Sequence, residues 1–393
     1  MLAIVTSHPI QNQAPLWRAL AAAGVKFEVW FLTPHAVKQS HDEEFGRTFA
    51  WDVDLLAGYP HRFLSVRDGW QLSQFNGIKL QRRWANELRE SGVTTLWLEG
   101  WRFRTLWQAA AAAHRAGIPI WLRGESHDLA PISWSRRIIK RFFLHRLFRQ
   151  VHRFLCIGSA NQRFYRAYGV AGEKLASAPY CVDNARFAQA AESARSGRAA
   201  QREHWSIPAD AYVVLFCGKF IAKKHPLDLL EAGRSLPELA GRPVHFLFVG
   251  DGELAGTMQQ QMNIPGAPRG TCTGFLNQSE IPNAFAAADC LVLPSDYGET
   301  WGLVANEALA SGLPVIASDR CGCAEDLAAP LGLAHVYPCG DIPKLCESLR
   351  HVATSPPAPV TLRTLIEKFS PERTAATVVA LLAQARDTGR RQP

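Results

Sequence analysis

Short apolar runs alternate along the chain with longer stretches in which apolar residues recur every three or four positions. The runs predict buried strands, and the periodic stretches predict helices. Strands separated in this way by helices are typical of parallel sheets that are covered on both faces. In the first half we expect strands at Leu2–Thr6, Phe27–Leu32, Thr95–Leu98, Ile120–Arg123 and Phe154–Ile157, and helices at Ala14–Ala23 and Thr105–Ala116.

A second series of strands begins after a polar stretch of small residues, AAESARSGRAAQR at 190–202, which we interpret as a linker or a helix beside one. The expected strands are Tyr212–Cys217, Val244–Val249, Gly270–Thr273, Cys290–Leu293 and Val315–Ala317. The fold class is therefore α/β, with two Rossmann-like domains whose parallel sheets face an interdomain cleft, because open sheets bind ligands at the carboxyl ends of their strands. We place the domains at 1–188 and 189–370, followed by a C-terminal helix at 371–393 that packs back on the first domain.

Two glutamates eight positions apart lie in the stretch LVLPSDYGETWGLVANEALASGLPVIA at 291–317. A buried strand is expected to end at Pro294, and a short helix at Leu303–Ser311 is stopped by Gly312. Glu299 then lies in the loop at the carboxyl end of the strand, and Glu307 lies on the helix.

The backbone amides around Trp301–Val304 open the same helix, and amides at a helix N-terminus suit a diphosphate. Each of the two carboxylates can accept a pair of hydrogen bonds from a sugar or ribose diol. The alternative is a structural one, in which Glu299 is an ordinary loop carboxylate and Glu307 is a surface residue of the helix.

The second half resembles a known family through several motifs in a fixed order. They are VVLFCGKF, Lys223-Lys224, FLFVGDGEL, GFLNQSEIPNAFAAADCLVLPS, the glutamate pair, SDRCGCAEDL and HVYPCGD. This order is similar to that of retaining GT-B glycosyltransferases of the glycosyltransferase family 4 type, the "glycosyl transferases group 1" domain. The first half resembles the family more loosely, through TSHPIQNQAPLWRAL, FGRTFAWDVDLLAGY, LRGESHD and APYCVDNARF.

The resemblance implies transfer of a sugar from a nucleoside-diphosphate-sugar to an acceptor, with retention of anomeric configuration and without a bound cofactor. The first domain would bind the acceptor and the second the donor. The implied donor-binding residues are Lys219, Lys224, Glu299, Thr300, Trp301, Gly302, Leu303 and Glu307.

Within this set, the resemblance gives Glu307 the ribose hydroxyls and Glu299 the transferred sugar. It gives Lys219 and Lys224 the role of the family's basic pair, and two such cations neutralise the charge that develops on the leaving diphosphate. The chain departs from the family here, because Lys219 stands for the usual Arg and His225 for the usual Gly. Lys lacks the bidentate fork with which Arg binds phosphate.

The residues of the first domain follow its expected strands. His8 and Gln11 stand in the first strand–helix loop, and Glu99 and Trp101 end a later strand, so we expect these four on the acceptor side. In Arg123-Gly124-Glu125-Ser126-His127, the family often has a histidine beside the reacting sugar. The register favours Glu125 for that place, and His127 is the alternative.

Other activities fit the chain less well. A nucleotide-sugar epimerase and a glycosyl phosphorylase use related two-domain folds, and a non-catalytic nucleotide-sugar-binding protein is a further alternative. An NAD-dependent enzyme is disfavoured because neither half has G-x-G-x-x-G after its first strand. Asp52-Val53-Asp54 resembles a metal-binding DxD, but the alternation in WDVDLL predicts an exposed strand face, so we expect no metal.

A net charge of +8 suggests an anionic partner. The cations gather at 136–153, where Arg and Lys alternate with Ile, Leu and Phe at helical spacing, and this pattern predicts a basic amphipathic helix. Two readings remain open for the helix: attachment to an anionic membrane surface, and a solvated outer face. Nucleic acid is not expected, because no recognition motif accompanies the charge. Without an apolar leader or span, we expect a cytoplasmic protein, with the inner face of the membrane as its place if the helix binds lipid.

Overall fold

The structure is a computed structural model that describes residues 1–35, 37, 40–42 and 47–390. Its contacts divide the chain into two compact units. The first comprises residues 1–38, 54–180 and 371–393, and the second comprises residues 39–53 and 181–370. The expected first domain, 1–188, therefore differs from the first unit at residues 39–53 and at its end.

The first unit is built around a parallel sheet in the order β5-β2-β1-β6-β7-β8-β9. Its strands are β1 (Leu2–Thr6), β2 (Phe27–Phe31), β5 (His61–Phe63), β6 (Thr95–Glu99), β7 (Ile120–Arg123), β8 (Arg153–Cys156) and β9 (Leu175–Ser177). Its helices are α1 (Ala14–Ala22), α2 (Trp84–Glu90), α3 (Arg104–Arg115), α4 (Trp134–Phe148), α5 (Ser159–Ala167) and α14 (Pro371–Arg390). The expected strands Leu2–Thr6 and Ile120–Arg123 agree with the structure residue for residue.

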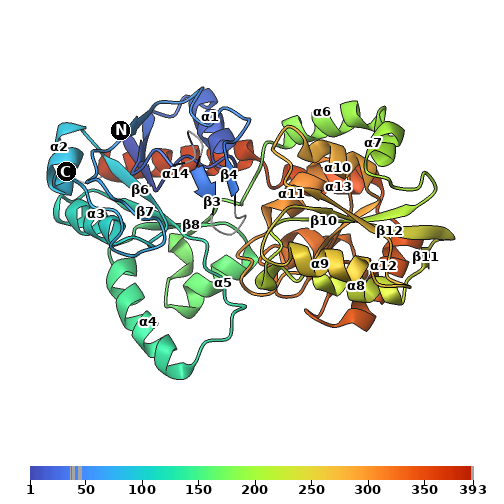
Figure 1. Ribbon diagram of the computed structural model, residues 1–393. Coiled ribbons are helices and arrows are strands. Elements are labelled where there is room, and N and C mark those ends of the chain that lie inside the picture. The colour runs from blue at the N-terminus through green and yellow to red at the C-terminus, as the bar shows by residue number, and fades with distance from the viewer. Residues whose placement is uncertain (36, 38–39, 43–46, 391–393) are drawn as a thin grey trace. The chain divides into compact units, whose positions relative to one another are not determined.

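The last helix of the chain, α14, belongs to the first unit. It contacts α1 and β9, and Figure 1 shows it in red beside the blue strands of that unit. The Thr374 hydroxyl donates a hydrogen bond to the Pro179 carbonyl oxygen at 3.0 Å. The chain therefore returns to the first unit after completing the second.

The second unit has a sheet in the order β11-β12-β10-β14-β15-β16, with β13 also paired to β12. The strands of this sheet are β10 (Tyr212–Cys217), β11 (Glu238–Leu239), β12 (Arg242–Val249), β13 (Gly270–Gly274), β14 (Cys290–Leu293), β15 (Val315–Ser318) and β16 (Val336–Tyr337). Two further strands of the unit, β3 (Ser40–Asp42) and β4 (Arg47–Phe49), pair antiparallel in a separate sheet. The helices of the unit are α6 (Asn184–Arg195), α7 (Arg198–His204), α8 (Leu227–Arg234), α9 (Ala255–Met262), α10 (Ile281–Ala287), α11 (Leu303–Ala310), α12 (Ile342–Thr354) and α13 (Pro359–Glu367). All pairings in the larger sheet are parallel except that of β11 with β12.

Residues 50–52 contact the segment after β13, which explains why they group with the second unit. The Asn277 amide donates to the Ala50 carbonyl at 2.8 Å, and the Asp52 carboxylate accepts from the Ser279 backbone N–H at 3.1 Å. The expected strand face at Asp52-Val53-Asp54 is wrong, because Asp52 and Val53 form bends and Asp54 is not in a strand. The Asp54 carboxylate accepts from the backbone N–H groups of Leu56 and Ala57, which holds a turn in place of a strand.

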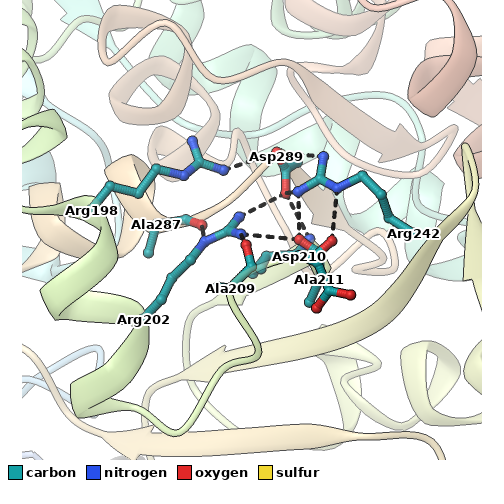
Figure 2. Close-up of polar contacts among 9 residues, drawn as sticks. Arg198, Arg202, Ala209, Asp210, Ala211, Arg242, Ala287 and Asp289 are labelled. Carbon is teal, nitrogen blue, oxygen red and sulfur yellow. Dashed lines mark hydrogen bonds and ion pairs between the residues drawn. The ribbon is translucent and has the colours of Figure 1, made fainter.

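The polar stretch at 190–202 is helical, since it lies in α6 and α7. Three guanidinium groups converge there on the Asp289 carboxylate, which Figure 2 shows. Arg198 and Arg202 each approach it to 2.9 Å, and Arg242 of β12 approaches to 3.2 Å. Arg202 is buried and also donates to the Ala287 carbonyl, so this cluster fixes α7 to the sheet.

The basic helix is shorter than expected. α4 ends at Phe148, and Arg153 is the first residue of β8. The reason is that the chain has begun to pair with the sheet by residue 152, where the His152 backbone N–H donates to the Ile120 carbonyl at 2.8 Å. The remaining cations of the predicted helix, apart from Arg149 at its C-cap, lie on α4.

Candidate active site

The loop between β14 and α11 holds the first of the paired glutamates. It turns into α11 at Gly302, whose φ of 103° lies in the left-handed region that glycine favours. A Cβ atom there would also lie 2.6 Å from the Leu293 Cδ2 atom. Glycine at 302 therefore allows Leu303 and Val304 to begin the helix directly after the loop, with their backbone N–H groups in its first turn.

Glu299 lies in this loop and forms an ion pair with Lys224, which lies outside it. Both side chains are largely buried, with 12% and 19% of their surface exposed, so solvent screens the pair only partly. The Ser295 hydroxyl donates a longer hydrogen bond to the same carboxylate oxygen at 3.5 Å. Glu299 and Lys224 thus meet at the carboxyl edge of the second sheet, although they lie 75 positions apart in the chain.

A second loop, which contains Gly322 and Cys323, donates backbone hydrogen bonds to the first. The Gly322 backbone N–H donates to the Glu299 carbonyl at 3.1 Å, and that of Cys323 donates to the Trp301 carbonyl at 3.0 Å. A Cβ atom at 322 would lie 2.0 Å from the Thr300 carbonyl oxygen, so only glycine permits this approach. Trp301 is buried and donates from its indole nitrogen to Asn306, which gives it a packing role under the loop.

Glu307 is buried on α11, with 5% of its surface exposed, so its reading as a surface residue of the helix is wrong. Burial raises the pKa of its carboxyl to about 7, while Arg186 and a hydrogen bond from Gln278 act in the opposite direction. Arg186 donates to Gln278 at 2.7 Å and 3.0 Å, which orders both partners. Sequence reasoning missed these two residues.

The basic pair lies at the end of β10. Lys219 is half-buried two residues after that strand, and Lys224 ends a short helical turn at Ala222–Lys224. Cys217 is the last residue of β10. Its thiol interacts electrostatically with both Glu307 and Lys224, which places the three side chains near one another. The turn at Gly250 after β12 packs so closely that a Cβ there would lie 1.9 Å from the Gly218 carbonyl oxygen.

His225 stands where the family usually has glycine, and the backbone conformation at this position explains the usual glycine. Its φ is 49°, in the left-handed region that glycine adopts more easily than histidine. Its ring lies 3.4 Å from the Asp228 carboxylate and 4.0 Å from that of Asp296. The hydrogen bond with Asp228 raises the pKa of the His225 imidazole, despite the opposing effect of its partial burial.

In the first unit, the loop after β7 carries Glu125 and His127. The Asn161 amide of α5 donates to the Gly124 and Ser126 carbonyls at 2.9 Å and 2.6 Å. Glu125 is exposed and accepts a hydrogen bond from the Tyr180 hydroxyl. His127 is half-buried, and its Nδ1 accepts from the Leu129 backbone N–H at 3.1 Å. Glu125 therefore presents the more open side chain of the two.

Glu99 at the end of β6 is more enclosed. Its side chain is 7% exposed, lies 3.9 Å from the Arg123 guanidinium, and accepts from the Gln13 amide at 3.4 Å. Burial raises the pKa of its carboxyl to about 7, and Arg123 acts in the opposite direction. Gln13, Arg123 and Tyr180 were not among the expected site residues.

The other residues expected on the acceptor side have different surroundings. Burial lowers the pKa of the His8 imidazole to about 4, and its ring meets that of His35 edge-on at 5.1 Å. Gln11 is half-buried in the turn before α1. The Trp101 ring lies parallel to that of Phe164 at 6.2 Å, and a Cβ atom at Gly124 would lie 2.0 Å from it. Trp101 therefore packs against the loop that follows β7.

Among the residues that the structure describes, no group of three or more His, Cys, Asp or Glu side chains could hold a metal ion. None of the helices in the same part of the chain has both the length and the apolar character needed to cross a bilayer.

Comparison with known protein families adds a match over the second unit. Residues 197–361 match the model of the family described as glycosyl transferases group 1. The processive diacylglycerol alpha-glucosyltransferase of Acholeplasma laidlawii is 33% identical over 120 residues, which are 30% of this chain and 34% of the relative. The alpha-D-kanosaminyltransferase of Streptomyces kanamyceticus is 32% identical over 32% of each chain, so this chain spans well under two thirds of the length of these relatives.

Solved structures resemble the whole chain. HepE from Anabaena, crystallised with UDP and glucose, has a TM-score of 0.68 at 16% identity, covering 98% of this chain and 99% of that one. Sucrose-phosphate synthase from Thermosynechococcus elongatus has a TM-score of 0.69 at 17% identity, with the same coverage. These likenesses show the GT-B fold, and they confirm the expected α/β architecture of two Rossmann-like domains.

Proposed function

We propose, because residues 197–361 match the model of the glycosyl transferases group 1 family, that the protein is a retaining glycosyltransferase. It would move a sugar from a nucleoside-diphosphate-sugar to an acceptor in glycan, glycolipid or glycoconjugate biosynthesis. The observation that carries the proposal is the Lys224–Glu299 ion pair beside the buried Glu307, all within the matched region. Charge neutralisation needs a cation such as Lys224, and sugar and ribose binding need hydrogen-bond acceptors such as Glu299 and Glu307.

In this proposal the leaving diphosphate lies against Lys219, Lys224 and the amides that open α11. The cations stabilise the negative charge that develops as the bond to the anomeric carbon breaks. Lys224 holds Glu299 in place before the donor arrives, so the carboxylate is oriented toward the sugar hydroxyls without further cost. Glu307 binds the ribose hydroxyls. Retention follows the family's front-face path through an oxocarbenium-like transition state, and no enzymic nucleophile is assigned.

We assign the acceptor to the first unit. Glu125 has the open carboxylate of the β7 loop and a fixed partner in Tyr180, which supports it over His127 as the group nearest the reacting sugar. Glu99, ordered by Gln13 and Arg123, offers a second carboxyl group for acceptor hydroxyls. His8, Gln11 and Trp101 stay on the acceptor side as neighbours of these groups.

The reaction itself is the test. We expect release of the nucleoside diphosphate from its sugar conjugate to require an acceptor, with an equal amount of glycosylated product. A nucleotide-sugar epimerase would consume the donor without an acceptor, and a phosphorylase would need inorganic phosphate. A binding protein would bind the donor and release no product, and any of these three outcomes would contradict the proposal.

We also propose that α4 attaches the protein to the inner face of an anionic membrane. Five of its apolar residues are unusually exposed, namely Trp134, Ile138, Ile139, Phe142 and Phe143. At helical spacing they share the side of α4 opposite the buried Leu144 and Phe148, and Arg136 and Arg141 flank them on the two edges. An exposed apolar stripe between cations is the pattern of a helix that lies in a bilayer interface. The curated diacylglycerol glucosyltransferase, named for a lipid, is consistent with this surface.

Ile138→Ser/Phe142→Ser should abolish this attachment. In sedimentation with phosphatidylglycerol vesicles we expect the wild type in the pellet and the variant in the supernatant, because the variant loses apolar area that enters the interface. Leu333→Ser/Val360→Ser is the matched control, since both residues are exposed and lie outside α4. Equal sedimentation of wild type and the α4 variant would contradict the assignment.

A further inference from the structure

A cavity of ≈ 730 Å³ lies within the first unit, and none of the residues assigned to donor or acceptor lines it. Its walls are the segment from Arg67 to Gln81, the start of α2, and one face of α3. On α3 the lining residues are Arg104, Gln108, Ala112 and Arg115, and this spacing of four, four and three places them along one side of a helix. Contacts between α2 and α3 close one side, and Figure 1 shows these two helices in cyan.

The wall opposite α3 is well ordered. The backbone N–H of Arg67 donates to the Lys79 carbonyl at 2.8 Å, and that of Gln81 donates to Ser65 at 2.8 Å, so the segment forms a hairpin. The Arg104 backbone N–H donates to the Phe75 carbonyl at 2.8 Å, which ties the hairpin tip to the first residue of α3. The cavity is therefore shaped before any ligand arrives.

The lining is strongly cationic. Its charged residues are Arg67, Lys79, Arg82, Arg83, Arg104 and Arg115, and no Asp or Glu is among the described residues that line it. Arg82 is paired with Glu87 and Glu90. For the other five cations, no ion pair is formed with any residue that the structure describes. Like charges gathered in this way repel one another, and a bound anion would relieve that repulsion.

The floor is apolar. Ile78, Trp84 and Ala112 line it and are 1%, 5% and 4% exposed, whereas the cations are exposed around the rim. An apolar floor lowers the local dielectric, so a charge bound above it interacts with the rim more strongly than it would on an open surface. The volume falls within the ~300–1,000 Å³ range of small-molecule sites, which favours a small ligand over a polymer.

We propose that this cavity binds a small ligand that carries two or more phosphate groups. Guanidinium groups match phosphate oxygens through paired hydrogen bonds, and most of the rim cations are arginines. A single anion would leave several cations uncompensated, whereas a diphosphate or a longer phosphate reaches more than one side of the rim. The ligand is either a free phosphorylated compound or a diphosphate joined to an apolar chain.

Calorimetric titration tests the proposal, with inorganic tripolyphosphate as one probe and geranyl diphosphate as the other. The full chain carries Lys219→Ala/Lys224→Ala throughout, so that diphosphate binding by the donor residues of the second unit does not contribute. We expect one site per chain, weakened as NaCl is raised. Adding Arg104→Ala/Arg115→Ala should weaken binding by about tenfold or more, because each removes a charge-assisted hydrogen-bond donor. The tighter probe tells which source of phosphate the cavity prefers.

Arg89→Ala/Arg363→Ala is the matched control, because it removes two exposed arginines that do not line the cavity. Arg104→Lys/Arg115→Lys should recover part of the affinity, since the charge returns without the fork. Unfolding temperatures without probe show that each variant is folded. The proposal is overturned if neither probe binds, or if the cavity variant binds as tightly as its parent.

Discussion

Glu307→Gln is expected to lower kcat/KM for the donor by roughly 10–100-fold and to stabilise the protein at alkaline pH. The loss follows because the amide replaces a carboxylate that would accept two hydrogen bonds from the ribose, and a hydrogen bond to a charged group contributes about 1.5–3 kcal/mol. The loss should appear mainly as a raised KM, since this contact is made before the reaction as well as during it. Steady-state kinetics with varied donor concentration measure both.

The stability gain follows from the buried carboxyl. The pKa of Glu307 is raised from 4.5 to about 7 by burial, so its contribution to stability is fully present below pH 4.5 and is lost as the pH rises through 7. A difference of this size corresponds to about 3 kcal/mol at high pH. Gln does not titrate, so the unfolding temperature of the variant should gain on that of the wild type as the pH rises from 4.5 to about 7, and the difference should then level off.

Glu367→Gln is the matched control for this prediction, because Glu367 is an exposed glutamate of α13. It should leave both turnover and the pH dependence of unfolding unchanged. A Glu307→Gln enzyme with wild-type kinetics would remove the ribose contact from the proposed site. Unfolding temperatures of the two proteins that change in parallel from pH 4.5 to 7 would contradict the buried-carboxyl explanation.

Lys224→Ala is expected to reduce kcat by roughly 10²–10³-fold, the size of effect seen when one preorganised group that stabilises transition-state charge is removed. The change deletes the cation beside the leaving diphosphate and also releases Glu299 from its ion pair. Because the charge on the diphosphate grows in the transition state, kcat should fall by more than donor affinity. Lys224→Arg should restore part of the rate, since it keeps the charge with a different shape.

Lys368→Ala gives the comparison for Lys224→Ala, because it removes an exposed lysine at the end of α13. Its kcat should match the wild type. If Lys224→Ala keeps its kcat and changes only donor affinity, the lysine binds the donor without assisting departure of the diphosphate.

The strands and most helices could be predicted because each depends on a local pattern. Tyr212–Cys217 and Cys290–Leu293 are continuous apolar runs, and such runs are buried on both faces of a parallel sheet. The end of α4 was less predictable, because the helical pattern of cations continues to Arg153. Pairing with β7 at residue 152 decides that boundary, and it depends on a strand 32 residues earlier in the chain.

For the same reason, only part of the candidate site could be predicted from the sequence. The two glutamates and two lysines lie in recognisable local motifs, whereas the groups that order them come from distant segments. Arg186 and Gln278 are 92 residues apart, and Gln13 and Glu99 are 86 apart. Burial of Glu307 was also hidden, because the 3.6-residue period of α11 does not reveal that both sides of the helix are covered.

Residues 39–53 show a further limit of local patterns. Alternation in WDVDLL predicted a strand, but Asn277 and Ser279 donate hydrogen bonds to Ala50 and Asp52, and Asp52 lies in a bend. Those partners lie more than 220 positions away, so no window of neighbouring sequence contains them. At His225, in contrast, the departure from the usual glycine did mark a real feature, a left-handed backbone.

A thermal-shift titration with UDP, GDP and ADP, with inorganic phosphate at matched ionic strength as the control, tests the central claim most directly. A nucleotide-sugar transferase binds its nucleoside diphosphate in the native state, so one of the three should raise the unfolding temperature with increasing concentration. The account predicts such a rise for one base in the wild type and its loss in Glu307→Gln. No shift with any of the three, or a shift that phosphate alone reproduces, would contradict it.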